Sequence, residues 1–214
     1  MNPKVDLKSP IKILIADDHP VVLDGVVAMV NSASDMDVVA TATGGAEALK
    51  AYMLNSVDVV LLDLNMPGMD GLSVITAIRS KSPDVRIIAF TSFSGDVRAS
   101  RVIKAGAKGF LLKTSARSEL LDAIRAVHRG ETYLSSTVAL EIAMNTGRKE
   151  LTPREVEVLK QIATCGPTKL VATEMGISEG TIKIHIKSVL AKLDVIDRTQ
   201  AIYASLKRGI ISNW

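Results

Sequence analysis

Five short apolar runs, each followed by a pattern typical of a helix, alternate over the front part of the chain. Because right-handed crossovers place helices on both faces of such a sheet, this alternation predicts a parallel, doubly wound α/β fold. We expect a flavodoxin-like, five-stranded sheet formed by residues 11–16, 37–42, 57–63, 85–90 and 109–112. The matching helices begin at residue 20 and near residue 45, and then cover residues 71–81, about 95–105 and about 115–128.

Polar side chains stand at the ends of four of these strands. Open sheets of this class bind their ligands at the carboxyl edge. That edge would gather five residues: Asp17, Asp18, Asp63, Thr91 and Lys113. Each of them alone has a plain structural explanation, such as a helix cap or a solvated charge, but their coincidence at four strand ends indicates a site.

The three aspartates at this edge indicate a bound cation, because neighbouring carboxylates repel one another unless a positive charge lies between them. Carboxylate oxygens, water and a backbone carbonyl are hard ligands suited to Mg²⁺. Asp63 is then a candidate nucleophile, since a carboxylate can attack phosphorus to form an aspartyl phosphate. The metal and the Lys113 ammonium would neutralise the developing charge, and the Thr91 hydroxyl could hydrogen-bond a phosphoryl oxygen.

Four motifs at these positions resemble the receiver domain of bacterial two-component response regulators: ADDHP, LLDLNMPGMDG, FTS and KGFLLK. The resemblance covers residues 11 to about 130 and implies that Asp63 accepts a phosphoryl group from a sensor histidine kinase. It also implies that Asp18, Asp63 and the carbonyl of Asn65 ligate Mg²⁺, while Asp17 acts through a water molecule.

The resemblance further implies a switch, in which Thr91 moves toward the phosphoryl group, Phe110 turns inward and Lys113 holds the phosphate. For Phe110 the alternative is a plain core aromatic. Many receivers have proline after this lysine, whereas this chain has Thr114. A trans Lys113–Thr114 peptide is expected, because a non-proline cis bond costs about 2.5–4 kcal/mol.

A haloacid-dehalogenase-like phosphohydrolase is the alternative chemistry, because it also uses a nucleophilic aspartate with Mg²⁺. That family needs a second aspartate as general acid two residues after the nucleophile. Asn65 stands there and cannot donate a proton in that way. The chain is therefore not expected to be an enzyme.

The chain is expected to form two domains: a receiver over residues 10–130 and a second domain over residues 148–214. Residues 131–147 would be a linker that can be helical in part, around 138–144. The second domain carries a net charge of +4, whereas residues 1–147 carry −1. A polyanionic partner would therefore meet the C-terminal part, although a charge of this size is common.

Helix signals in the second domain predict a helix-turn-helix. Thr152, Pro153 and Glu155 form the capping-box start of one helix. A glycine turn follows a shorter helix, and Ser178 then caps a third. A helix, a short helix, a tight turn and a helix are the geometry of this DNA-binding motif.

The helix over residues 179–194 has an apolar stripe and, outside it, Thr181, Lys183, Ile184 and Lys187. Ile184 points away from the stripe, because a step of two residues turns a helix by about 200°. Thymine methyl groups in a major groove would contact this isoleucine, and the two lysines would reach guanine edges or phosphates. The alternative is an ordinary solvated helix face with one stray isoleucine.

The segments LTPREVEVLKQIA, ISEGTIKIHIKSVLAKLDV and DRTQAI closely resemble the LuxR-type helix-turn-helix domain. With the receiver ahead of it, the whole chain resembles a response regulator of the NarL/FixJ group. The resemblance implies contacts with double-stranded DNA: Lys183, Ile184 and Lys187 in the major groove, and Thr181, Lys169 and Lys192 on phosphates.

The implied function is a Mg²⁺-dependent transcriptional regulator, in which phosphorylation of Asp63 favours a homodimer and DNA binding. RNA polymerase is a further partner open to such a regulator. The alternative class is an interaction protein whose C-terminal domain contacts other proteins and not DNA.

The composition favours a folded protein of the cytoplasm. No apolar run approaches the roughly 20 residues that span a bilayer, and the N-terminus MNPKVDLKSP has no signal core. We therefore expect no membrane association. Cys165 is the only cysteine, which excludes an intrachain disulfide.

Overall fold

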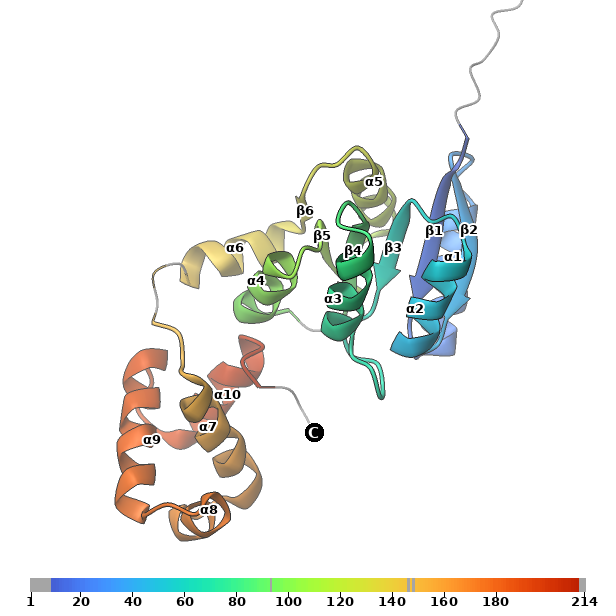
Figure 1. Cartoon of the computed structure of the whole chain (residues 1–214). Coiled ribbons are helices and arrows are strands. Elements are labelled where there is room, and N and C mark those ends of the chain that lie inside the picture. The colour runs from blue at the N-terminus through green and yellow to red at the C-terminus, as the bar shows by residue number, and fades with distance from the viewer. Residues whose placement is uncertain (1–8, 93, 146, 148, 212–214) are drawn as a thin grey trace, which may run out of the picture. The chain divides into compact units, whose positions relative to one another are not determined.

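A computed structural model describes residues 9–92, 94–145, 147 and 149–211. The chain divides into two compact units, one built around a sheet and one made of helices (Figure 1). The division falls after residue 139, and residues 94–98 are grouped with the second unit. The two helices that these boundaries cut, over residues 96–104 and 136–145, are described with the sheet unit. Each unit is described by itself.

The sheet unit alternates strands and helices in the expected order. Its elements are β1 (Ile11–Ala16), α1 (Pro20–Asn31), β2 (Met36–Ala42), α2 (Gly45–Leu54), β3 (Val59–Leu62), α3 (Gly71–Lys81), β4 (Arg86–Thr91), α4 (Asp96–Lys104), β5 (Gly109–Leu112), α5 (Arg117–His128), β6 (Tyr133–Leu134) and α6 (Ser136–Asn145). All neighbouring strands are parallel, in the order β2-β1-β3-β4-β5-β6. The predicted doubly wound α/β class is confirmed.

The predicted number of five strands is wrong by one. The sixth strand, β6, has two residues and pairs with β5 through Tyr133 and Leu134. Two residues are too few to produce an apolar run or an alternating pattern, so the sequence does not reveal this strand. Both β6 and α6 lie within residues 131–147, which were predicted to be a linker that can be helical in part.

One face of the sheet is covered by α1 and α5. Their buried side chains pack against alternate strand residues, which include Ile13, Leu61, Ile88 and Leu111. Because successive residues of a strand point to opposite faces, Phe110 faces the other side of the sheet. No described peptide bond is cis, so the expected trans Lys113–Thr114 peptide is confirmed.

The second unit consists of α7 (Pro153–Cys165), α8 (Thr168–Met175), α9 (Glu179–Leu193) and α10 (Arg198–Lys207). The predicted capping box starts α7, where Thr152 Oγ1 accepts from Glu155 N and the Glu155 carboxylate accepts from Thr152 N. Gly176 ends α8 in the left-handed region with φ of 63°, which needs a residue without Cβ strain. The predicted order of helix, short helix, turn and helix is therefore observed.

Candidate functional site

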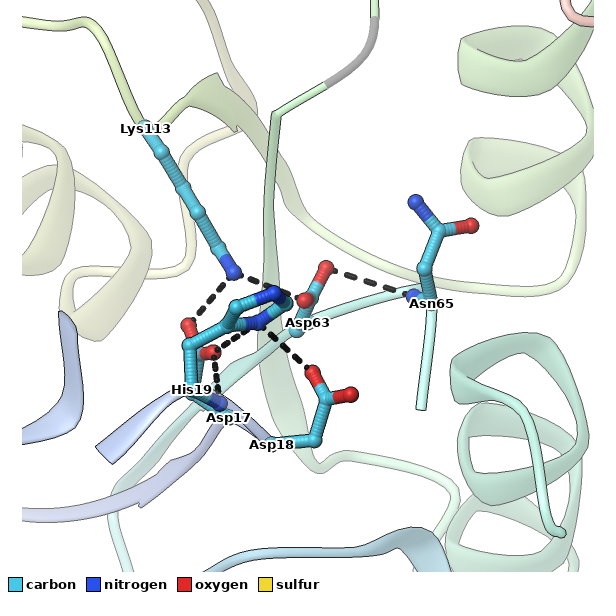
Figure 2. A network of polar contacts seen from close by, with 6 residues as sticks. All are labelled: Asp17, Asp18, His19, Asp63, Asn65 and Lys113. Carbon is cyan, nitrogen blue, oxygen red and sulfur yellow. Dashed lines mark hydrogen bonds and ion pairs between the residues drawn. The ribbon is translucent and has the colours of Figure 1, made fainter. Parts of the chain in front are cut away.

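The carboxyl edge of the sheet brings together residues from three different strand ends. Asp17 and Asp18 follow β1, Asp63 follows β3, and Lys113 follows β5. Figure 2 shows their side chains converging on one small region. This convergence follows from the topology, since β1 lies beside β3, and β4 lies between β3 and β5.

Three aspartates and one histidine form a cluster of potential metal ligands at this edge. Asp17, Asp18, His19 and Asp63 each offer one ligand atom, and these atoms all lie within 4.8 Å of one another. The residues Asp17 and Asp63 are both only 2% exposed. Carboxylate oxygens gathered at this density are the hard donors that Mg²⁺ prefers, so the residues present fit such an ion.

Lys113 supplies the positive charge of the edge. Its Nζ lies 2.6 Å from Asp17 Oδ2 and donates to Asp63 Oδ2 at 2.7 Å. Burial by itself would lower the pKa of this lysine. The hydrogen bonds to Asp17 and Asp63 outweigh that effect, and the pKa of Lys113 lies above its ordinary value, so the side chain is a cation.

Backbone contacts fix the position of Asp63. Its N–H donates to Ala16 O at 2.8 Å, which ties the end of β3 to the end of β1. The N–H of Asn65 donates to Asp63 Oδ1 at 3.3 Å and orients the carboxylate. Gly71 permits this close approach, because a Cβ there would collide with the carbonyl oxygen of Asp63. The Asn65 side chain is exposed and points away from Asp63 (Figure 2).

Thr91 and Phe110 lie on β4 and β5, two neighbouring strands of the sheet. Thr91 is the last residue of β4, and its carbonyl oxygen accepts from Lys113 N at 2.8 Å. Phe110 pairs with Ala89 in the parallel register, so it shares a face with Thr91. Both residues are fully buried, which for Phe110 agrees equally with a core residue and with an inward switch residue.

His19 belongs to this edge, although the sequence predicted no role for it in the site. Its Nδ1 lies 2.9 Å from Asp18 Oδ1 and 3.3 Å from Asp17 Oδ1. Its backbone N–H donates to Asp17 Oδ1 at 3.0 Å. The available signal was its position directly after two aspartates at a strand end.

The helix α9 presents a separate polar face in the second unit. Ile182, Ile186, Val189 and Leu193 are buried, as the periodicity predicted. Lys183, Ile184 and Lys187 are exposed, and Ile184 is 70% exposed. Thr181 near the start of α9 is half-buried, and Lys169 on α8 is exposed.

Lys192 lies apart from the exposed face of α9. Its Nζ donates to Glu155 Oε2 at 2.7 Å, and Ser188 donates to Glu155 Oε1 at 2.7 Å. Glu155 is only 4% exposed. In this structure Lys192 therefore joins α9 to the start of α7.

The doubly wound sheet with an acidic edge and a buried lysine, followed by a helix-turn-helix, defines a receiver coupled to a DNA-binding domain. Residues 13–125 match the response regulator receiver domain, and residues 149–205 match the luxR family of bacterial regulatory proteins. The chain belongs to the NarL/FixJ-type response regulators. It is a DNA-binding transcriptional regulator of a two-component system and not an enzyme.

Relatives match over nearly the full chain. The transcriptional regulatory protein LiaR of Bacillus subtilis is 41% identical over 91% of this chain and 96% of its own length. The nitrate/nitrite response regulator NarL of Escherichia coli is 36% identical over 91% of this chain and 94% of its own. A solved RcsB–DNA complex covers 93% of this chain and 99% of its own, with a TM-score of 0.72 and 26% identity.

Within the part of the chain that the structure describes, every helix is too short or too polar to cross a bilayer.

Proposed function

We propose that Asp63 is the phosphoacceptor of this regulator and that a partner histidine kinase is the donor. One observation carries the proposal: a buried carboxylate at the end of β3 lies 2.7 Å from the Lys113 ammonium and within 4.8 Å of two further aspartates. An ammonium and a cation-binding acidic cluster on one carboxylate are what phosphoryl transfer to that carboxylate requires.

In the proposed reaction an Asp63 oxygen attacks phosphorus, and the bond between phosphorus and the kinase histidine nitrogen breaks. Lys113 keeps its proton and neutralises the incoming phosphoryl oxygens, while the Asn65 N–H orients the acceptor carboxylate. Mg²⁺, when bound, supplies further charge neutralisation. Asp18, Asp63 and the Asn65 carbonyl would hold it, with Asp17 acting through water.

We further propose that Thr91 and Phe110 respond to the phosphoryl group. The Thr91 hydroxyl would bond a phosphoryl oxygen, and Phe110 would repack on the face of the sheet that it shares with Thr91. The shared register of β4 and β5 supports the pairing of these two motions. The shifted population would form a homodimer.

For DNA binding we propose that α9 enters the major groove with Lys183, Ile184 and Lys187, and that Thr181 and Lys169 contact phosphates. The exposure of these side chains beside a buried apolar stripe supports this face. We leave Lys192 out of the set, because its ammonium is bonded to Glu155. RcsB, whose solved structures with DNA cover 93% of this chain, supports DNA as the ligand of the helical unit. We also propose that the protein acts in the cytoplasm, where its DNA target would lie, and that RNA polymerase is a further partner.

Labelling by acetyl phosphate tests the phosphoacceptor. Asp63→Asn should abolish the phosphate-dependent mobility shift on a Phos-tag gel, whereas Asp37→Asn, at an exposed residue of β2, should leave it intact. Undiminished labelling of Asp63→Asn would show that the acceptor is another residue.

Salt-dependent binding to duplex DNA tests the recognition face. Replacing both Lys183 and Lys187 by Ala should weaken binding and reduce the slope of log K against log salt by about 0.9 for each lost phosphate contact. Replacing the exposed Lys160 and Lys207 on other helices is the matched control. Equal losses in the two double variants would remove the assignment of α9.

A further inference from the structure

We propose that His19 adds an imidazole nitrogen to the divalent-cation site, so that this site binds first-row transition-metal dications more tightly than its oxygen ligands alone would. The inference rests on the metal site of the proposed function and names the class of cation that this particular chain can select. Imidazole is a good ligand for Ni²⁺, Co²⁺ and Zn²⁺, whereas Mg²⁺ prefers oxygen.

The His19 ring is directed at the carboxylates. Figure 2 shows its nitrogen facing both Asp17 and Asp18. The Nδ1 atom lies 2.9 Å from Asp18 Oδ1 and 3.3 Å from Asp17 Oδ1. One nitrogen and two oxygens from three consecutive residues therefore lie close together at the acidic cluster.

These separations fit adjacent ligands of one small cation. Metal–ligand bonds of about 2.0–2.2 Å place neighbouring ligands of an octahedral or tetrahedral ion roughly 2.9–3.5 Å apart. Both distances from His19 Nδ1 fall in this range. A dication could therefore be bound here with small side-chain movements.

The oxygen atoms on the His19 side have capacity for a cation. Lys113 occupies the Oδ2 atoms of Asp17 and Asp63, whereas their Oδ1 atoms each accept a backbone N–H, from His19 and Asn65, and keep a lone pair for a further partner. Asp18 Oδ1 is buried, and although His19 Nδ1 lies 2.9 Å from it, it accepts no well-formed hydrogen bond from the described residues. A buried carboxylate oxygen without a hydrogen bond is costly, and a bound cation would satisfy it.

The backbone holds His19 in place while its ring stays accessible. His19 is the N-cap residue of α1, it is followed by Pro20, and its N–H is bonded to Asp17 Oδ1. Its side chain is nevertheless 63% exposed. A cation can thus enter from solvent and keep water as its remaining ligands.

Isothermal titration of the full-length, untagged chain with Ni²⁺ and with Mg²⁺ tests the inference. His19→Gln should weaken Ni²⁺ binding roughly tenfold or more, since even indirect ligand partners typically contribute 10–100-fold. Mg²⁺ affinity should change less than about twofold, which also verifies that the variant is folded. The matched control replaces His128 and His185, the other two histidines, by Gln and should bind Ni²⁺ as the parent does.

A second measurement locates the metal. Substoichiometric Mn²⁺ should broaden the NMR signals of the His19 ring, and excess Mg²⁺ should restore them. Unchanged Ni²⁺ affinity in His19→Gln, or a ring that Mn²⁺ does not broaden, would overturn the role of His19.

Asp18→Asn separates this failure from that of the proposed function. Loss of both Mg²⁺ and Ni²⁺ binding in Asp18→Asn, with Ni²⁺ binding intact in His19→Gln, refutes only the imidazole ligand. Intact Mg²⁺ binding in Asp18→Asn refutes the metal site itself, and the inference with it.

Discussion

Each unit of the chain buries a carboxylate paired with a lysine, and the two pairs differ in how fully their oxygens are satisfied. In the helical unit, both oxygens of Glu155 accept hydrogen bonds, from Lys192, Ser188 and the N–H of Thr152. Burial alone would raise the pKa of Glu155. These donors outweigh burial and lower the pKa to about 2.

At the sheet edge, one ammonium lies among three carboxylates and bonds two of them. Lys113 bonds to Asp17 and Asp63, whereas Asp18 has a buried oxygen that contacts the exposed His19 ring and accepts no well-formed hydrogen bond from the described residues. The edge therefore carries surplus negative charge and free acceptor atoms. The Glu155–Lys192 pair, with all its oxygens hydrogen-bonded, joins α9 to the start of α7. The carboxylates at the sheet edge keep acceptor capacity that a bound cation could satisfy.

Lys113→Met should have the largest effect, because it leaves the acidic cluster without its internal cation. We expect the sheet unit to lose about 4 kcal/mol of stability, as when one partner of a buried ion pair is removed. Mg²⁺ at ten times its Kd should restore about 1.4 kcal/mol. Amide hydrogen exchange, resolved for the two units with and without Mg²⁺, measures both changes. A loss of stability that Mg²⁺ does not reduce would contradict the idea that the sheet edge carries surplus negative charge.

Glu155→Gln should cost the helical unit about 3 kcal/mol near neutral pH, the value of a carboxyl pKa lowered from 4.5 to about 2. Because the folded-state pKa is depressed, this stabilisation is full above pH 4.5 and is lost as the pH falls toward 2. Urea unfolding as a function of pH should show this loss in the parent and not in the variant. Mg²⁺ should not restore the stability of Glu155→Gln, because the Glu155 site has no free carboxylate oxygen for a cation in the parent and no carboxylate in the variant.

Asp18→Asn should change the stability of the sheet unit by less than about 1 kcal/mol, and in the stabilising direction, because it removes one of three like charges. The same variant should lose the increase in melting temperature that Mg²⁺ produces in the parent. Differential scanning calorimetry measures both. A clear destabilisation would mean that Asp18 has a structural partner, as Glu155 has.

Arg125→Gln provides the exposed reference and should have the smallest effect. Arg125 bonds the exposed Asp35 at 2.8 and 3.0 Å, and that hydrogen bond lowers the pKa of Asp35. Solvent screens such pairs, so the expected cost is below about 0.5 kcal/mol. If Arg125→Gln lowers the free energy of unfolding in urea as much as Glu155→Gln does, burial does not explain the difference between the Arg125–Asp35 and Lys192–Glu155 pairs.

The sheet and the acidic edge could be predicted because they follow from local signals. Apolar runs mark the strands, and parallel strands bring their carboxyl ends to one edge whatever the length of the helices between them. That rule alone placed Asp17, Asp63 and Lys113 together. The exposure of Ile184 followed in the same way from helical periodicity.

Contacts between distant residues were beyond the sequence. The capping box revealed Glu155, but only the packed helices show that Ser188 and Lys192 close on the same carboxylate. Lys192 was accordingly predicted to be a phosphate contact. His19 was overlooked because a histidine beside a proline reads as a helix start, and its ring direction depends on the folded edge.

The short strand β6 has a consequence for how the protein can associate. It makes β5, which holds Phe110 and ends one residue before Lys113, an inner strand: Tyr133 N–H donates to Lys108 O and Ser135 N–H to Phe110 O. The outermost strand on this side offers only two residues, too few to recruit a strand from another molecule. Two copies of the chain therefore cannot extend the sheet at this edge, and a dimer formed on this side would have to use helix surfaces.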